Sequence, residues 1–208
     1  MDRPLVIAHR GSCLKEPENT LPAFQLALDE GADGIELDVW RCGSGEIVVT
    51  HNRDLSLLTG QSGNVEKLSL TQLRQLDFGK GEKIPTLEEV LELVPHIEVL
   101  NIEIKGTHFW DRGIEKAVFQ ILQGRGMLQR TIVSSFNPFI LFRLRRISRQ
   151  IPLGLIFHKA SLLPLRRAWA AYLIKLVSLH PGLGCLSPEL AQRARRKNQK
   201  QGKINEFT

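Results

Sequence analysis

The run GIELDVW, residues 34 to 40, constrains the fold most, because it places two carboxylates two residues apart in an otherwise apolar segment. Side chains alternate between the two faces of a β-strand, so the aliphatic residues of the run face one way and Glu36 and Asp38 face the other. The run therefore predicts a strand with one core face and one anionic face. Crowded carboxylates repel one another, so the anionic face needs cations nearby.

The segment NIEIK, residues 101 to 105, repeats this alternation. Its two isoleucines are expected to face helices, while Asn101, Glu103 and Lys105 point inward. A second strand with a polar inner face is therefore predicted.

Short apolar runs alternate with helix-like segments along most of the chain. This order predicts parallel strands covered by helices, and in the barrel form of that architecture the reactive groups lie at the carboxyl ends of the strands. The strand candidates are residues 4–9, 34–39, 46–51, 99–105, 131–136, 152–157, 176–180 and 203–207. The helix candidates are residues 19–31, 69–77, 86–94, 111–126, 137–148 and 187–199.

One junction breaks the alternation, because only RCGSG separates GIELDVW from the next strand candidate. A parallel crossover needs a dozen or more residues, so these two runs are expected to form an antiparallel hairpin. The hairpin brings His51 close to Glu36 and Asp38. The first strand candidate ends in His9 and Arg10, which the barrel architecture places at the same rim.

Three carboxylates at one rim favour a metal site. A hard divalent cation prefers oxygen ligands and removes their mutual repulsion, so Glu36, Asp38 and Glu103 are the expected ligands. The alternative is an ion network in which the carboxylates pair with Arg10 and Lys105. The two nearby histidines favour the metal site.

The formal net charge of +6 comes from basic clusters that are expected either to be solvated helix faces or to steer an anionic substrate. No nucleic-acid-binding module accompanies them, so a nucleic-acid partner is not expected. Three widely spaced cysteines argue against a disulfide framework and a zinc finger. The basic clusters are residues 142–150, 165–169 and 193–200, and the cysteines are Cys13, Cys42 and Cys185.

The segment from 162 to 180 is apolar, but three basic residues interrupt it and leave no run long enough to span a membrane. Peripheral membrane contact through an amphipathic helix at about 162–177 is the alternative. The N-terminus runs from MDRP into the short apolar run LVIA, without the pattern of a secretory signal, so a cytoplasmic protein is expected.

The segment IAHRGSCLKEPENTLPAFQLALDEGADGIELDVWRCGSGEIVVTHNRDL, followed by NIEIK, closely resembles the glycerophosphodiester phosphodiesterase family, relatives of the phosphatidylinositol-specific phospholipases C. The His-Arg-Gly strand end, the Pro-Glu-Asn-Thr turn, Glu-x-Asp, the second His and Asn-Ile-Glu-Ile-Lys occur in the family's order. Weaker similarity extends through VSSF and SLHP to about residue 200.

The resemblance implies a distorted TIM (β/α)8 barrel that hydrolyses small glycerophosphodiesters, such as glycerophosphocholine or glycerophosphoethanolamine. The products would be sn-glycerol 3-phosphate and an alcohol, and the cofactor one divalent cation, Mg²⁺ or Ca²⁺. By position, His9 and His51 resemble the catalytic acid–base pair. Glu36, Asp38 and Glu103 resemble the metal ligands.

The residue types also fit phosphodiester chemistry by themselves. The substrate is anionic, so Arg10 and Lys105 are expected to bind its phosphate. One histidine would deprotonate the nucleophile and the other would protonate the leaving alcohol. We favour His9 as the base and His51 as the acid.

Three further polar residues carry less weight. In PENT, Glu18 and Asn19 are expected to fix the loop and cap the following helix rather than to touch substrate, since Asn is a preferred capping residue. The following helix is expected to start at Asn19 or Thr20. His180 ends a strand candidate and could reach the pocket mouth.

The expected domain is a single barrel over residues 1–208 with a small insertion at about 52–85 above the site. Asn52 replaces the family's usual Asp, which could weaken support for His51. The barrel is expected to lack its last helix and strand, with its seventh strand near 203–207. Two alternatives remain. The basic amphipathic region at 162–177 favours a lysophospholipase D-like enzyme, and the missing last helix and strand favour a truncated, inactive relative that binds metal or phosphate.

Overall fold

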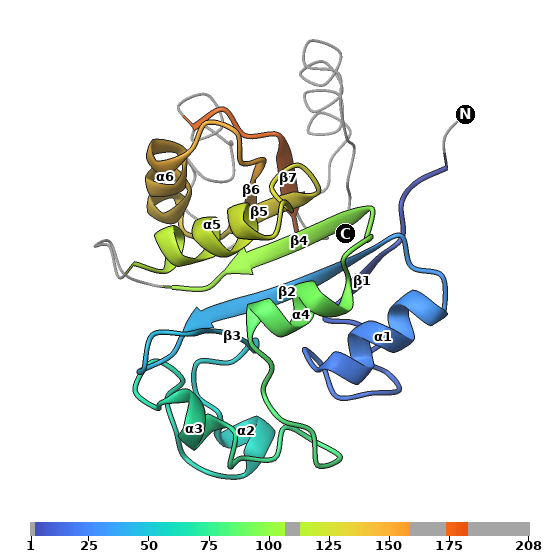
Figure 1. Ribbon diagram of the computed structural model, residues 1–208, viewed down its shortest axis with the longest axis vertical. Coiled ribbons are helices and arrows are strands. Elements are labelled where there is room, and N and C mark those ends of the chain that lie inside the picture. Colours follow the sequence, from blue (N-terminus) through green and yellow to red (C-terminus); the bar gives the residue numbers. More distant parts are fainter. Residues whose placement is uncertain (1–2, 107–112, 159–173, 183–208) are drawn as a thin grey trace.

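A curled, mostly parallel sheet carries helices on its outer side (Figure 1). The computed structural model describes residues 3–106, 113–158 and 174–182. Seven strands pair in the order β1-β2-β4-β5-β6-β7, and β3 pairs antiparallel with β2. The strands are β1 (Ile7–His9), β2 (Gly34–Arg41), β3 (Ile47–Val49), β4 (Val99–Ile104), β5 (Thr131–Ser135), β6 (Leu153–Phe157) and β7 (Ser178–Pro181).

Six helices occur in the described residues, and α1, α4, α5 and α6 follow the order that the sequence predicts. Helices α1 and α4 lie together against β2, while α5 and α6 lie together beside the later strands (Figure 1). The helices are α1 (Leu21–Asp29), α2 (Ser56–Thr59), α3 (Leu70–Leu73), α4 (Leu87–Leu93), α5 (Ile114–Gly124) and α6 (Pro138–Ile147).

The predicted hairpin between β2 and β3 is confirmed. Val39 pairs with Val49, and the Cys42 amide donates to the Glu46 carbonyl to close the turn. Beyond the last pair, the Thr50 amide still donates to the Asp38 carbonyl. His51 therefore follows directly beside Asp38, as the short connection predicts.

Two hydrophobic clusters lie on opposite faces of β2. Ile35, Leu37 and Val39 join the main core under the four longer helices. Trp40 faces the other way and packs with residues of the 52–85 segment, among them Leu55 and Leu73. The insertion therefore has its own small core and continues the face that carries Glu36 and Asp38. A single domain over residues 1–208 stays a prediction.

Several element ends differ from the sequence expectations. Of the two residues expected to cap α1, Thr20 is confirmed, because its side chain accepts the Ala23 amide, and Asn19 is not, because it adopts a left-handed backbone. The helix expected at 69–77 ends after one turn, at Leu73, although a capping box begins it. Capping fixes where a helix begins but adds too little stability to extend it.

The expected strand at 203–207, the helix at 187–199 and most of the amphipathic segment at 162–177 lie outside the described residues. Within the described residues, no helix is long and apolar enough to cross a membrane.

Candidate active site

The carboxyl ends of the strands converge on one pocket, as the barrel prediction requires. Its volume is about 480 Å³. Asp38 is fully buried just behind it and touches two of its lining residues. The structure thus brings all seven predicted site residues together. The lining residues are His9, Arg10, Glu36, His51, Asn101, Glu103, Lys105, Phe136, Ile156, His180, Pro181 and Gly182.

The three predicted metal ligands form one buried cluster. Parallel pairing sets Asp38 opposite Glu103, and Glu36 lies two residues before Asp38 on the same face of β2. One oxygen from each carboxylate lies within 4.8 Å of the others. A cluster of three buried carboxylates that close together is the donor set a hard cation prefers.

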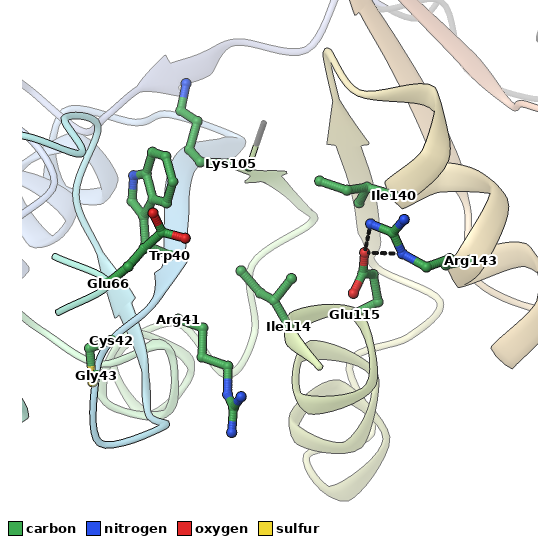
Figure 2. A pocket seen from close by; sticks show the side chains of 11 residues that line it. Trp40, Arg41, Cys42, Gly43, Glu66, Lys105, Ile114, Glu115, Ile140 and Arg143 are labelled. Carbon is green, nitrogen blue, oxygen red and sulfur yellow. Dashed lines mark hydrogen bonds and ion pairs between the residues drawn. The ribbon is translucent and has the colours of Figure 1, made fainter. Parts of the chain in front are cut away.

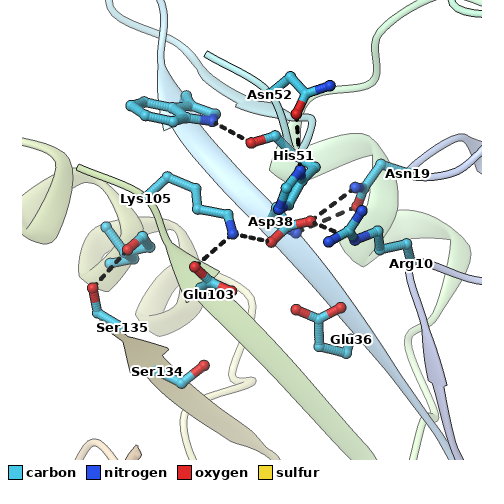
Figure 3. A network of polar contacts seen from close by, with 12 residues as sticks. Arg10, Asn19, Glu36, Asp38, His51, Asn52, Glu103, Lys105, Ser134 and Ser135 are labelled. Atoms are coloured by element: carbon cyan, nitrogen blue, oxygen red, sulfur yellow. Dashed lines mark hydrogen bonds and ion pairs between the residues drawn. The ribbon is translucent and has the colours of Figure 1, made fainter. Parts of the chain in front are cut away.

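Two cations already contact two of these carboxylates (Figure 3). Lys105 Nζ lies 2.9 Å from Asp38 Oδ1 and 2.6 Å from Glu103 Oε1. Arg10 Nε lies 3.2 Å from Asp38 Oδ2. The ion network weighed as an alternative is therefore present, but within the described residues it includes neither oxygen of Glu36.

Glu36 tests whether the cluster also suits a metal. Its Oε2 is buried and has no hydrogen-bond partner in the described part of the chain, and its nearest basic nitrogen is His9 Nε2 at 3.7 Å. A buried carboxylate oxygen without a hydrogen bond is costly. A divalent cation beside Glu36, Asp38 and Glu103 would satisfy it, so the residues fit the metal that the family implies.

The electrostatics of the cluster point the same way. Burial raises the pKa of Glu36 well above its usual range, and the charges of Asp38 and Glu103 raise it further. Burial likewise raises the pKa of Glu103 to about 7, although Lys105 opposes the shift. Without a cation, the cluster therefore holds more protons than three exposed carboxylates would.

Asp38 and Lys105 stabilise each other's charged forms. Burial alone would raise the pKa of Asp38, but Lys105 and then Asn19 and Arg10 lower it below its ordinary value. Burial alone would lower the pKa of Lys105, but Asp38 and Glu103 raise it. This pair stays ionised when the cluster takes up protons.

The loop after β1 holds Arg10 in a strained conformation. Its backbone is left-handed, with φ 60°, and is fixed because its amide donates to the Glu36 carbonyl while its own carbonyl accepts the Asn19 amide. Next to it, Gly11 has φ 83°, and a β-carbon there would lie 2.6 Å from the Ala23 carbonyl carbon. Only glycine permits this close approach.

Two residues of PENT support the site rather than cap a helix. Glu18 accepts hydrogen bonds from Arg10 Nη1 at 3.1 and 3.2 Å. Asn19 Nδ2 donates to Asp38 Oδ2 at 3.0 Å, and Asn19 Oδ1 accepts the Asp38 amide at 3.3 Å (Figure 3). The predicted capping role of Asn19 is therefore wrong, while the prediction that both residues fix the loop agrees with these contacts.

The two histidines line the same pocket as Glu36 and Glu103. The His9 side chain is 60% exposed, and burial of its ring and then the charge of Arg10 lower its pKa. His51 is anchored at two points: its carbonyl accepts the Trp40 indole N–H at 3.3 Å, and its Nδ1 lies 2.9 Å from Asn52 Oδ1. Asn52, which stands where the family usually has Asp, therefore still supports the His51 ring through a side-chain oxygen.

Two further polar residues line the pocket, Asn101 and His180, and each is hydrogen-bonded to a buried serine. His180 Nε2 lies 2.9 Å from Ser178 Oγ, and Asn101 Oδ1 accepts a hydrogen bond from Ser134 Oγ at 3.0 Å. Burial lowers the pKa of His180 to about 4. His180 therefore lines the pocket as a neutral ring, deeper than the mouth position that the sequence suggested.

A second cavity, of about 360 Å³, adjoins the first (Figure 2). Lys105 lines both cavities. The second cavity has a mixed wall, in which Ile114 and Ile140 lie near an ion pair between Glu115 of α5 and Arg143 of α6, with Nη2 and Oε1 2.5 Å apart. No sequence pattern predicted this cavity, because its wall combines residues from distant segments.

Comparisons with known proteins agree with this fold. The model of the glycerophosphoryl diester phosphodiesterase family matches residues 9–202. A glycerophosphodiester phosphodiesterase of Caldanaerobacter subterraneus is 35% identical over 206 residues, which cover 95% of this chain and 84% of the relative. The solved glycerophosphodiester phosphodiesterase of Thermotoga maritima has a TM-score of 0.75 and 28% identity, covering 99% of this chain and 88% of that one.

A phosphodiesterase from Oleispira antarctica was solved in complex with its product sn-glycerol-3-phosphate. It has a TM-score of 0.79 and 29% identity, and the match covers 93% of this chain and 81% of that one. These neighbours confirm the distorted TIM-barrel fold class, and fold and site together define a phosphoric diester hydrolase. The chain belongs to the glycerophosphoryl diester phosphodiesterase family.

Proposed function

We propose that the chain hydrolyses small glycerophosphodiesters to sn-glycerol 3-phosphate and an alcohol, with one divalent cation, Mg²⁺ or Ca²⁺. The observation that carries the proposal is the buried cluster of Glu36, Asp38 and Glu103, flanked by two histidines at the carboxyl ends of the strands. The sn-glycerol-3-phosphate held by the Oleispira antarctica neighbour supports the choice of product.

The cation would be held by Glu36, Asp38 and Glu103. When bound, it would draw charge from a phosphate oxygen and lower the barrier to attack at phosphorus. The raised pKa of Glu103, about 7, supports this assignment, because a carboxylate that resists ionisation alone gains most from an adjacent cation.

His9 would act as the general base. Its lowered pKa favours the neutral ring, which can accept a proton from water or from the glycerol hydroxyl next to the phosphate. His51 would act as the general acid: its Nδ1–H would donate to Asn52 Oδ1, and in the doubly protonated ring its Nε2–H would be transferred to the leaving alcohol.

Arg10 and Lys105 would bind the phosphate. Both line the pocket while contacting Asp38, so their charges face the substrate from fixed positions. Fixed cations stabilise the charge that accumulates on the phosphate oxygens in the transition state without reorganising.

The decisive experiment follows glycerol 3-phosphate release from glycerophosphocholine with Mg²⁺ or Ca²⁺. We expect turnover that a chelator abolishes, and a decrease of about 10²–10⁴-fold in kcat for His9→Ala and for His51→Ala, because each removes a proton-transfer group. His96→Ala, on the exposed stretch after α4, is the matched control and should leave turnover unchanged.

Turnover that persists with chelator would remove the cation from the proposal. Turnover that persists in either histidine variant would remove that residue's assignment. A folded chain that binds the cation but releases no product would instead support the binding-only alternative.

A further inference from the structure

The outer face of α6 carries exposed aromatic rings that continue from the pocket mouth. Phe136, which directly follows β5 and lines the catalytic pocket, is 41% exposed. One helical turn apart on α6, Phe139 and Phe142 are 46% and 49% exposed, whereas Ile140, Leu141 and Leu144 are buried. Residues three apart lie on the same side of a helix, so Phe139 and Phe142 form an exposed apolar strip on α6, which begins two residues after Phe136. Exposed rings gathered in this way mark an interaction surface.

The carboxyl end of α6 is cationic. Arg143 and Arg145 turn toward the protein: Arg143 pairs with Glu115, and Arg145 donates to the carbonyl of Ile174. Arg146 and Arg149, in contrast, are exposed at the end of the helix. No Asp or Glu occurs in α6. The exposed face therefore combines aromatic rings with positive charge and carries no acidic residue of the helix itself.

We propose that this face, formed by Phe139, Phe142 and Arg146 with Arg149 just past the helix end, docks on an anionic lipid surface. Exposed phenylalanines beside basic residues on one helix face suit an interface in which rings enter the headgroup region and cations meet anionic lipids. Because Phe136 connects this face to the pocket, docking would bring the pocket close to the layer in which phospholipid-derived diesters arise. This last point rests on the proposed function; the docking itself does not.

Vesicle binding tests the proposal directly. The purified chain is sedimented with phosphatidylcholine vesicles that contain phosphatidylglycerol, and with vesicles of phosphatidylcholine alone. We expect binding to the anionic vesicles that weakens with added salt. The Phe139→Ser, Phe142→Ser double variant should bind about tenfold less tightly or worse, and so should the Arg146→Gln, Arg149→Gln double variant.

Leu57→Ser is the matched control, because Leu57 is an exposed apolar residue of α2, away from this face. It should bind as the parent does. Thermal unfolding and turnover of soluble glycerophosphocholine in all variants show that they fold, since none of these residues lines the catalytic pocket.

The proposal fails if the parent ignores anionic vesicles, or if the phenylalanine variant binds them as the parent does. It also fails if the parent binds no lipid and forms oligomers that the phenylalanine variant does not form. That result would mean that the face joins two copies of the chain. Absent turnover with intact vesicle binding would overturn the proposed function while supporting the docking face, so the two failures are distinguishable.

Discussion

Asn19 grips Asp38 with both ends of its side-chain amide, and both residues are buried. These two hydrogen bonds orient the Asp38 carboxylate so that its Oδ1 points at Lys105 Nζ. Asn19→Ala should therefore weaken Mg²⁺ or Ca²⁺ binding by about 10–100-fold, the usual effect of losing a residue that orients a metal ligand. Isothermal titration calorimetry measures the change.

Gln25→Ala is the matched control for Asn19, because its amide contacts only Asp29 on the exposed side of α1. It should bind the cation like the parent. Unchanged affinity in Asn19→Ala would show that Asp38 is held by Lys105 and Arg10 alone.

Glu103 makes cation binding depend on pH. Its pKa of about 7 in the metal-free protein means that below pH 7 it is mostly protonated and must release its proton before it binds a cation. The affinity should therefore rise with pH through 7 and level off above it, with the raised pKa of Glu36 adding to the rise. Calorimetry in buffers of different ionisation enthalpy counts the protons released.

Glu103→Gln separates this effect from any other titration. The variant should bind more weakly at all pH values, with a flatter dependence near pH 7. A pH dependence as steep as that of the parent would assign the titration to another group.

At this scale the sequence predicted that the seven residues gather at one place, but not which residues support them. Glu36, Asp38, Glu103 and Lys105 follow from strand alternation, which is local. The contact from Asn19 to Asp38 spans 19 residues and depends on the left-handed turn before α1. The local preference of Asn for helix caps pointed elsewhere.

At the scale of the elements, the pairing of β6 with β7 requires a residue without a side chain at position 154. A β-carbon on Gly154 would lie 2.7 Å from both His180 Nε2 and Ser178 Oγ, which are buried on the adjacent strand. Gly154→Ala should lower the free energy of unfolding by about 1–3 kcal/mol, the usual cost of overpacking. Urea unfolding measures it.

Gly124→Ala is the control for this substitution. Gly124 ends α5, and a β-carbon there would meet nothing within 4 Å. Since alanine restricts the unfolded chain, this variant should gain about 0.4–1 kcal/mol. Equal stability of Gly154→Ala and the parent would mean that β7 shifts away from β6 without cost.

The order of elements was predictable where local rules act. The five-residue connection required a hairpin, and the apolar runs located all seven described strands to within three residues at each end. The curl of the sheet and the packing of residues 52–85 on Trp40 were not predictable, because they depend on contacts between distant segments. The expected role of 52–85 above the site has no local signal beyond its position after His51.

At the scale of the whole molecule, the buried Glu36 carboxylate is expected to lower the stability of the metal-free chain. Glu36 is buried without a hydrogen bond to Oε2, and its pKa is raised, so the folded chain favours the protonated form. A raised carboxyl pKa gives stability that is fully present below the unfolded value of 4.5 and is lost as pH rises through the folded pKa. At pH 8 the metal-free chain should therefore be less stable than a variant whose side chain at position 36 cannot ionise.

Glu36→Gln tests this trade-off through two unfolding measurements. Without cation, its free energy of unfolding should equal or exceed that of the parent, and the difference should grow with pH. With cation at about 100 times the dissociation constant, the parent should gain about 2.7 kcal/mol, because the ligand binds only the folded state, and the variant should gain much less. Glu92→Gln, which removes an exposed carboxylate paired with Arg125, should keep the full cation effect. If Glu36→Gln is instead less stable than the parent at every pH without cation, Glu36 stabilises the fold itself, and the cluster is not a site maintained for a cation.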